Sequence, residues 1–442
     1  MKKILLKKLF LITCLLGLFN PLQAQDILSE SQAIKLALKN NFGVLIGENN
    51  LEISANNKSI LNTRFLPTLG ASAGANYNLN TISANFQNGT TTELVGAKSS
   101  SFNAGLNLNY TLFDGLGRWY NFKQLKERYA LSELEARTSI ENAIFLTLSA
   151  YYDIAVQLNN VKVSTEAVEV SKIRVLRTTQ EFNYSQGNKL SVLNAQVDLN
   201  NDSINLANAT LALANSKRNL NAIIVQDIQA DFQINEDLKF IENFEKNTLH
   251  EAMLENNVSL LQLKKNMRIG QYNENIFRAQ YLPTIAATTQ YGWNRSNNNE
   301  ASFLASATSY GLSAGATLSW NLFDGGTTRT SMQNAKLTNE NLALQQAELE
   351  NNLARDFEIA WADYRNKIYL YTTQEKNLIS NEDNFNRTNE QFKLGLVSSV
   401  EYRQAQQNLL TVETQVTQSK YSAKLAEIKL LQLAGLLLET DF

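Results

Sequence analysis

One set of sequence signals occurs twice in this 442-residue chain, and the duplication restricts the possible folds more than any other feature. Two motif pairs recur at an offset of 216: Asn40-Asn41 with Asn256-Asn257, and Leu66-Pro67 with Leu282-Pro283. Two more recur at an offset of 210: Leu112, Phe113, Asp114 and Gly115 with Leu322, Phe323, Asp324 and Gly325, and Ala195-Gln196 with Ala405-Gln406. Such self-similarity predicts one structural unit used twice. We therefore expect repeats at 25–225 and 248–435, separated by a linker at 226–247 and followed by a tail at 436–442.

Each repeat is predicted to begin with a helix. Ser29 with Gln32, and Thr248 with Glu251, have the spacing of a capping box, in which each side chain satisfies the backbone of the other residue. These helices are expected to run to Leu66 and Leu282, because proline disfavours helical geometry in the residue before it.

Beyond each proline the apolar residues alternate with polar residues or glycine, which predicts β-strands. The predicted strands lie at about 68–80 and 102–112 in the first repeat, and at about 284–294 and 310–322 in the second. Segments 81–101 and 295–309 are rich in Asn, Ser, Thr and Gly, so we expect solvent-exposed loops there.

Long helices are predicted after each Leu-Phe-Asp-Gly motif. Residues 118–186 and 327–394 contain neither glycine nor proline, and at 1.5 Å per residue each would form about 100 Å of helix. We expect Gly187 and Gly395 to end them, with shorter helices at 190–225 and 400–434 following. The narrow apolar stripes of the long helices favour coiled-coil packing, so each repeat is predicted to be a strand hairpin on an antiparallel helical stalk.

Four strands in one chain predict a barrel shared by several chains. An unpaired strand edge facing lipid is costly, so a membrane sheet must close, and natural membrane barrels use at least about eight strands. Two, three or four copies would satisfy this requirement. Aromatic residues near the strand ends fit the two membrane interfaces: Tyr77, Tyr110, Trp119, Trp293 and Trp320. The alternative is a soluble pair of β-hairpins packed on helices.

Residues 1–24 have the pattern of a secretory signal, with four lysines ahead of an apolar run from Leu9 to Phe19 and Ala24 at the expected cut. The only cysteine, Cys14, lies inside this segment, and lipid attachment there is the less favoured alternative because the apolar run continues past it. Cleavage would leave 36 basic and 42 acidic residues, so nucleic acid is not an expected partner.

No catalytic, cofactor or metal site is predicted. The single histidine, His250, has no second metal ligand at a suitable spacing, and no Ser or Cys has another base to activate it. The chain is therefore not expected to be an enzyme. Two alternative functions stay open: an elongated periplasmic or surface coiled-coil scaffold, and an uptake porin, although porins need no long helices.

The duplicated motifs and the glycines at the helix ends resemble those of the TolC family of outer-membrane efflux proteins over essentially the whole chain after residue 24. The resemblance implies an outer-membrane homotrimer with a 12-stranded barrel in the lipid and a long α-helical tunnel in the periplasm. It also implies two partners, a periplasmic adaptor (membrane fusion) protein and an inner-membrane pump of the RND or ABC type. Residues 226–247 would form the equatorial segment around the tunnel.

The resemblance also implies roles for residues at the periplasmic tip. The gate positions hold Phe392, Glu401 and Gln404, but Val397 stands where the family has an arginine and Gln404 replaces an acid. Glu401 either faces the pore or is an ordinary solvated helix charge. The tips expected to contact the adaptor are Gln186 and Gly187 in the first repeat, and Leu394, Gly395 and Leu396 in the second.

Overall fold

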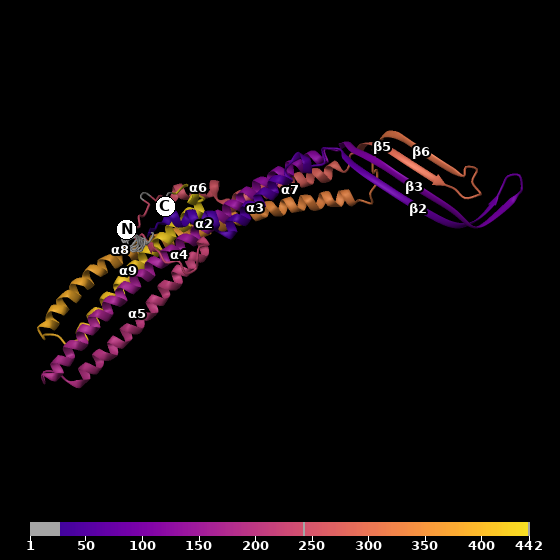
Figure 1. The fold of residues 1–442 in the computed structure, drawn as a ribbon. Coiled ribbons are helices and arrows are strands. Elements are labelled where there is room, and N and C mark those ends of the chain that lie inside the picture. Colours follow the sequence, from indigo (N-terminus) through magenta and orange to yellow (C-terminus); the bar gives the residue numbers. More distant parts are fainter. Residues whose placement is uncertain (1–26, 242–243, 441–442) are drawn as a thin grey trace, which may run out of the picture. The chain divides into compact units, whose positions relative to one another are not determined.

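A computed structural model describes residues 27–241 and 244–440. The signal-like segment 1–24, with Cys14, and the C-terminal Phe442 lie outside the described residues. The chain is mainly helical with one four-stranded antiparallel sheet. Its elements are β1 (Ile27–Leu28), α2 (Glu30–Asn40), α3 (Phe42–Asn57), η1 (Ile60–Asn62), β2 (Thr68–Asn85), β3 (Thr91–Asp114), α4 (Gly117–Asn183), α5 (Lys189–Ile224), β4 (Gln233–Ile234), α6 (Lys246–Asn256), α7 (Val258–Ala279), β5 (Thr284–Asn297), β6 (Ser306–Ser319), α8 (Thr327–Lys393), α9 (Ser399–Ala434) and η2 (Leu437–Glu439) (Figure 1).

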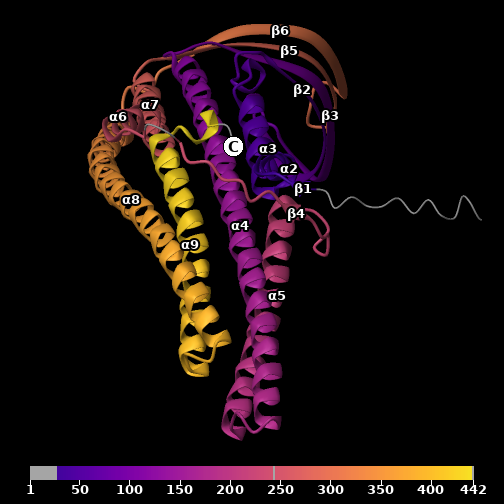
Figure 2. The same cartoon turned by 90° about the vertical axis from the view of Figure 1, so that its left-hand side faces the viewer.

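The chain divides into two compact units, and each contains segments of both repeats. One unit comprises Met1–Ile46, Arg137–Val258 and Asn351–Phe442, and it holds α5 and α9 together with the later parts of α4 and α8 (Figure 2). The other comprises Gly47–Ala136 and Ser259–Glu350, and it holds the sheet. No helix within 27–241 and 244–440 carries an apolar stretch long enough to cross a membrane.

The same two offsets relate the equivalent helices of the repeats. Helices α2 and α6 have 11 residues each, and their first residues are related by the offset of 216. Helices α4 and α8 have 67 residues each, α5 and α9 have 36 each, and the offset of 210 relates the first residues of both pairs. Equal lengths at constant offsets mean that the duplicated sequence forms the same helices twice.

The sheet has the strand order β2-β3-β5-β6, so β3 and β5 join the repeats while β2 and β6 are the edges. The register places apolar side chains of all four strands in common rows. One row is Ala71, Leu106, Tyr291 and Leu312, and the next is Ala73, Ala104, Trp293 and Tyr310. Side chains alternate between the faces of a strand, so these rows form one apolar face. The opposite face carries mainly Asn, Ser, Gln and Gly.

The strands differ from the predicted ones at their ends. Residues 81–101 are not a long loop, because β2 continues to Asn85 and β3 begins at Thr91. Backbone pairing between β2 and β3 continues through this polar stretch, with a shift in register between Asn80 and Ile82. Gly96, in the same stretch, has a φ of 72°. Strand β6 begins earlier than predicted and ends at Ser319, so Leu322, Phe323, Asp324 and Gly325 lie beyond the strand, whereas Leu112, Phe113 and Asp114 are the last residues of β3.

The first helices of each repeat are shorter than predicted. Each breaks at an asparagine with a non-helical backbone, Asn41 or Asn257. A second helix then ends at Asn57 or Ala279 rather than at the residue before proline. The capping box of Ser29 and Gln32 is present. The box predicted for Thr248 is wrong, because α6 begins after Glu245 without a side-chain cap.

A buried ion pair fixes the linker between the repeats. Lys424 and Glu427 on α9 are 5% and 0% exposed, with their charged groups 2.6 Å apart. The Lys424 ammonium also donates to the Lys239 carbonyl at 2.7 Å, and the Glu427 carboxylate accepts from the Ile241 amide at 3.0 Å. Satisfied in this way, the two buried charges hold linker backbone against α9.

Candidate functional site

Both helical hairpins end in the same type of turn. In the second hairpin Gly395 has a φ of 74°, and the Leu396 amide donates to the Gln391 carbonyl at 2.9 Å. This is the Schellman arrangement, which satisfies the last carbonyls of a helix and favours glycine at the left-handed position. Leu394 and Leu396 flank this glycine and are 74% and 71% exposed. The tip therefore exposes two apolar side chains.

The left-handed residue of the first tip is Ser185, not Gly187. Ser185 has a φ of 60° and is the equivalent of Gly395 at the offset of 210, and the Gln186 amide donates to the Glu181 carbonyl at 2.8 Å. The prediction that Gly187 ends α4 is therefore wrong, because the helix already ends at Asn183. Gln186 and Gly187 are both exposed, immediately beyond this turn.

Phe392 of α8 packs between side chains of two other helices, α9 and α4. Its ring stacks on Tyr402 of α9 with centroids 4.5 Å apart, and the Arg177 guanidinium of α4 lies 4.4 Å from its centroid. Only 9% of Phe392 is exposed. Burial raises the pKa of the Tyr402 hydroxyl. This aromatic residue of the tip thus joins its own hairpin to the first one.

Glu401 and Gln404 occupy exposed positions in the first turns of α9. The Glu401 carboxylate accepts hydrogen bonds from the Ser398 amide at 2.7 Å and hydroxyl at 2.8 Å, completing a capping box. The amide hydrogen bond, followed by the hydroxyl, lowers the pKa of Glu401. Gln404 donates to the Asn408 side chain at 2.9 Å. Glu401 therefore has a role in starting α9 whether or not it also faces a pore.

A cluster of charged side chains joins the first hairpin to α9, and we name it the clasp: Ser171 and Arg174 of α4, Asp198 and Asp202 of α5, and Ser399, Arg403 and Gln406 of α9. Both nitrogens of the Arg403 fork donate to Asp202, at 2.7 and 2.8 Å. Arg174 donates to Asp198 at 2.5 Å and to Ser399 at 2.7 Å. Two-pronged contacts of this kind fix geometry as well as charge.

Most of the clasp is buried. Arg174 and Asp202 are each 4% exposed, and Gln406 is 2% exposed. Two arginines balance two aspartates, which limits the cost of removing four charges from water. Yet Arg403 Nε and Gln406 Nε2 are buried without a hydrogen-bond partner among the described residues. The aspartate carboxylates of the clasp thus accept hydrogen bonds from the arginines, whereas two of its buried donor nitrogens have no acceptor among the described residues.

The clasp was not found by sequence reasoning, although one signal pointed to it. Asp198 and Asp202 are the only acidic residues of α5, and their i, i+4 spacing places them on one helix face. The arginine sought at position 397 is absent, but Arg403 lies six residues further on, inside α9. The family resemblance predicted a positive charge in the turn before α9. In this chain the arginine lies within α9 instead.

The Leu-Phe-Asp-Gly motif builds the turn from sheet to helix in both repeats. Gly115 and Gly325 have φ values of 66° and 69°, a region that glycine adopts without strain. The preceding aspartates accept hydrogen bonds from amides in the first helical turn, Asp114 from Arg118 at 2.9 Å and Asp324 from Thr328 at 2.8 Å. Glycine reverses the chain and aspartate starts the helix, which explains why the motif recurs.

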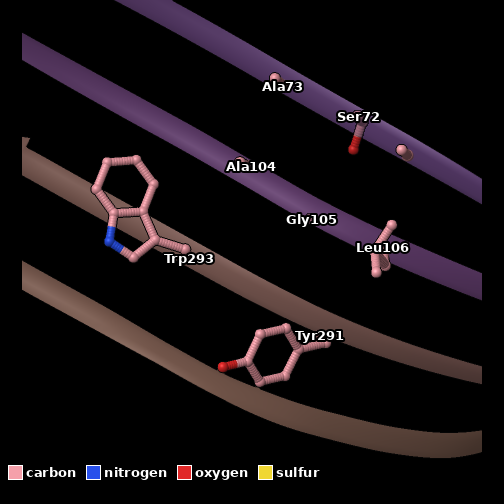
Figure 3. Close-up of a pocket in the computed structure, with 8 residues that line it drawn as sticks. Ser72, Ala73, Ala104, Gly105, Leu106, Tyr291 and Trp293 are labelled. Carbon is pink, nitrogen blue, oxygen red and sulfur yellow. The ribbon is translucent and has the colours of Figure 1, made fainter.

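The apolar face of the sheet has a shallow hollow between β2, β3 and β5 (Figure 3). Small side chains of β2 and β3, Ala71, Ala73 and Ala104, line it together with the larger side chains of Leu106, Tyr291 and Trp293. Apolar residues of this face are widely exposed, including Leu312 at 70% and Leu69 at 70%. An apolar surface of this extent marks contact with lipid or with another protein.

Within residues 27–241 and 244–440, no group of three or more His, Cys, Asp or Glu side chains is placed to hold a metal ion. His250 instead packs edge-on against the Phe357 ring, with centroids 5.3 Å apart.

Comparisons with known proteins agree with this geometry. The sequence model described as outer membrane efflux protein matches residues 33–224 and 249–436, the two repeats. A comparison with curated protein sequences finds no match. The fold is similar to that of the CmeC outer membrane channel of Campylobacter jejuni, with a TM-score of 0.78, 18% identity, and coverage of 92% of this chain and 86% of that one.

Two further solved structures share the fold. The outer membrane protein VceC of Vibrio cholerae has a TM-score of 0.74 and 14% identity, with 92% of this chain and 96% of that one covered. The MtrE outer membrane channel of Neisseria gonorrhoeae, solved in an open state, has a TM-score of 0.67 and 18% identity, with 92% and 89% covered. Because the family model matches both repeats, and so most of the chain, this protein belongs to the outer membrane efflux protein family and is located in the outer membrane.

Proposed function

We propose that this protein is the outer-membrane exit duct of a tripartite efflux or type I secretion system, a passive conduit from the periplasm or an inner-membrane pump to the exterior. The observation that carries the proposal is the sheet, which has one continuous apolar face and, within the described residues, two unpaired edge strands. A lipid-facing sheet cannot leave edges open, so several copies must complete a barrel. The polar face would then line the lumen.

Three copies are proposed from the family resemblance, giving a 12-stranded barrel and a helical tunnel. The stretch from Leu69 to Leu79 on β2 matches the length of a tilted membrane strand, which is roughly 9–11 residues. Tyr77 lies toward one end of the apolar face and Tyr110 toward the other, as expected for aromatic residues at the two membrane interfaces. Outer-membrane lipid is thus the proposed partner of this face, and residues 226–247 are the proposed equatorial segment.

The helical tip is proposed as the periplasmic gate, with Phe392, Glu401 and Gln404 as its candidate residues. The clasp supports a gate because it fixes α9 to the first hairpin, so that the two hairpins of one chain would move as a unit when the tip opens. Replacing Glu401 with Lys should change ion selectivity if this side chain lines the constriction. Unchanged single-channel currents would instead assign Glu401 to its capping role alone.

The tips are also the proposed contact with a periplasmic adaptor, which would connect the duct to an RND or ABC pump that supplies the energy. The exposure of Leu394 and Leu396 supports this role. Leu394→Asp with Leu396→Asp should abolish export in cells while leaving conductance of the purified protein intact. Equal export by the variant and the parent would remove these leucines from the interface.

The decisive test is conductance in planar lipid bilayers, together with fractionation of cell membranes. A duct should co-sediment with outer membranes and give discrete channels. A coiled-coil scaffold should give none, and a non-conducting protein that separates from the outer membrane would overturn the proposal. An uptake porin would conduct, but deleting its gene would not increase sensitivity to, or retention of, any exported compound.

A further inference from the structure

Charged residues in the sheet are few and unevenly placed. Strands β2 and β6 contain none, β5 contains only Arg295, and β3 contains Glu93, Lys98 and Asp114. Asp114 belongs to the turn into α4, where it accepts from the Arg118 amide. The other three lie toward the end of the sheet that carries the β2–β3 turn and the β5–β6 loop, opposite to the connections with the helices. The two basic residues at that end therefore need a separate explanation.

Arg295 lies on the apolar face of the sheet. It is two residues beyond Trp293 on β5, and residues two apart in a strand point to the same face. The register places it in one row with Ala75, Phe102 and Thr308. Its side chain is exposed, and it makes no ion pair within residues 27–241 and 244–440. A cation at the edge of a lipid-facing surface attracts anionic headgroups.

Lys98 lies on the same face, further from the helices. It is four residues from Phe102, the row partner of Arg295, and so about 14 Å further along the strands. Glu300 lines the same small recess as Lys98, but the two form no ion pair in the described part of the chain. Glu93 lies beyond the register shift in β2 and β3. Arg295 is thus the charge closest to the apolar rows at this end.

The hollow on the apolar face lies directly beside Arg295. The row of Ala73, Ala104 and Trp293, which lines the hollow, is one row away from that of Arg295, or about 7 Å along the strands (Figure 3). The volume of the hollow is about 490 Å³, within the range of roughly 300–1,000 Å³ that is usual for ligand sites. An apolar hollow with a cation at its outer end suits a molecule with an apolar chain and an anionic head.

We propose that this part of the apolar face binds a phosphorylated lipid of the outer leaflet, with an acyl chain in the hollow and a phosphate on Arg295. The planar guanidinium can bind a phosphate through two parallel hydrogen bonds. Lys98 would contact a second phosphate of the same headgroup. The proposal rests on the proposed function, which turns the apolar face toward lipid and places the helices in the periplasm, and it adds the chemistry of one lipid.

The row between the two basic residues favours a sugar headgroup. It carries hydroxyl and amide groups on all four strands: Tyr77, Ser100, Asn297 and Ser306. Such groups can donate hydrogen bonds to sugar oxygens and accept them from sugar hydroxyls. At the end of the sheet near the helices the strands hold no basic residue. A diphosphorylated glycolipid is therefore the proposed ligand, and one end of the apolar face alone would bind it.

Lipid binding to the purified oligomer in detergent tests the proposal. The probe is lipid A, a diphosphorylated glycolipid, and native mass spectrometry counts the bound molecules at each oligomer size. Arg295→Gln with Lys98→Gln should weaken binding at least tenfold. The matched control is Arg365→Gln with Lys376→Gln, because these exposed basic residues lie on α8 in the other compact unit. Equal binding by the site variant and the parent, or an equal loss in the control, would overturn the site.

The hollow is tested without changing any charge. Ala104→Leu would fill part of it and should weaken the binding of lipid A at least fivefold. Undiminished binding by this variant would show that the acyl chain does not use the hollow, which contradicts the proposal.

Two further probes separate the possible sources of the phosphate. A large excess of inorganic phosphate should not displace lipid A, and displacement would reveal a site for free anions instead. Phosphatidylcholine, which has acyl chains but no net charge, should bind at least tenfold more weakly than lipid A. Equal binding of the two lipids would reject the role of the basic residues.

Conductance separates this result from the proposed function. Channels formed by a parent protein that shows no preference for lipid A would leave the duct intact and reject only the lipid site. Specific binding of lipid A by a protein that forms no channels would support the lipid site and count against the duct.

Discussion

The side-chain amide of Asn257 donates a 2.9 Å hydrogen bond to the carbonyl of Leu433, close to the end of α9. Asn41 makes the equivalent bond to Ile223 at 3.0 Å, close to the end of α5. Each asparagine also ends the first helix of its repeat. The duplicated Asn-Asn motif therefore marks a point where the first helix stops and is held to the last helix of the same repeat.

Replacing Asn257 with Ala should destabilise this junction by about 1–3 kcal/mol, because the partly buried Leu433 carbonyl would lose the hydrogen bond from the asparagine side chain. Amide exchange at the C-terminal end of α9 would measure the effect. Asn257→Asp keeps the size but removes the donor, so it should behave like the alanine variant. Exchange rates equal to those of the parent would show that packing alone holds the junction.

The ion pair of Lys424 and Glu427 should be essential for the position of the linker. Removing one partner leaves a buried charge uncompensated, at a cost of about 3–5 kcal/mol. Lys424→Met should therefore expose the linker near Lys239 to protease. The double variant Lys424→Met with Glu427→Leu should be cut more slowly than the single variant, since no charge then stays buried. Equal cleavage of both would contradict this account.

Much of the fold was accessible from the sequence because the chain repeats its signals. Motif offsets of 210 and 216 predicted which helices correspond, and the long helices begin at or next to the predicted positions. Strand faces followed from alternation, since Leu69, Ala71 and Ala73 do share a face with Leu106 and Leu108. These features depend on local periodicity, which a single sequence records directly.

The features that were missed depend on contacts distant in sequence. The polar composition of 81–101 predicted a loop, but pairing between the two segments extends the strands beyond it. Asp202 and Arg403 are 201 residues apart, so no local pattern could reveal their contact. Ser185 adopts a left-handed backbone, although glycine adopts this conformation with less strain and Gly187 is only two residues away. In each case long-range structure overrides residue preference.

Breaking the clasp should loosen α9 at the tip. In Arg403→Ala the buried Asp202 would lose both hydrogen bonds from the guanidinium, at a cost of about 3–5 kcal/mol, or at least about a hundredfold in local opening. Amide exchange in the first turns of α9 would report this change. Arg403→Lys keeps the charge but not the two-pronged geometry, so an intermediate effect is expected. Amide exchange as slow in the alanine variant as in the parent would show that the packing of Phe392 is enough to hold α9 in place.

The start of α9 should depend on pH through Glu401. Its pKa is lowered in the folded protein, so the stabilisation is fully present above the ordinary value of 4.5 and is lost as pH falls through the lowered one. Amide exchange at Ser398 and Glu401, corrected for intrinsic rates, should therefore rise below that pH. Glu401→Gln should remove the dependence, because glutamine still accepts a hydrogen bond but does not titrate. The same pH profile in both proteins would contradict the assignment.

Between neighbouring copies of the proposed trimer, at a seam where α9 of one copy would face α5 of the next, the clasp would have no charged counterpart. The offset moves Asp202 to Val412 and Arg403 to Leu193, both without charge. Hairpins within one chain should thus stay joined while the tip separates between chains. Leu193→Arg with Val412→Asp would place a second clasp at that seam, and channel open probability should fall at least tenfold relative to the parent. Val412→Asp alone is the control and should not lower it. If the double variant opened as freely as the parent, the tip would not separate at this seam.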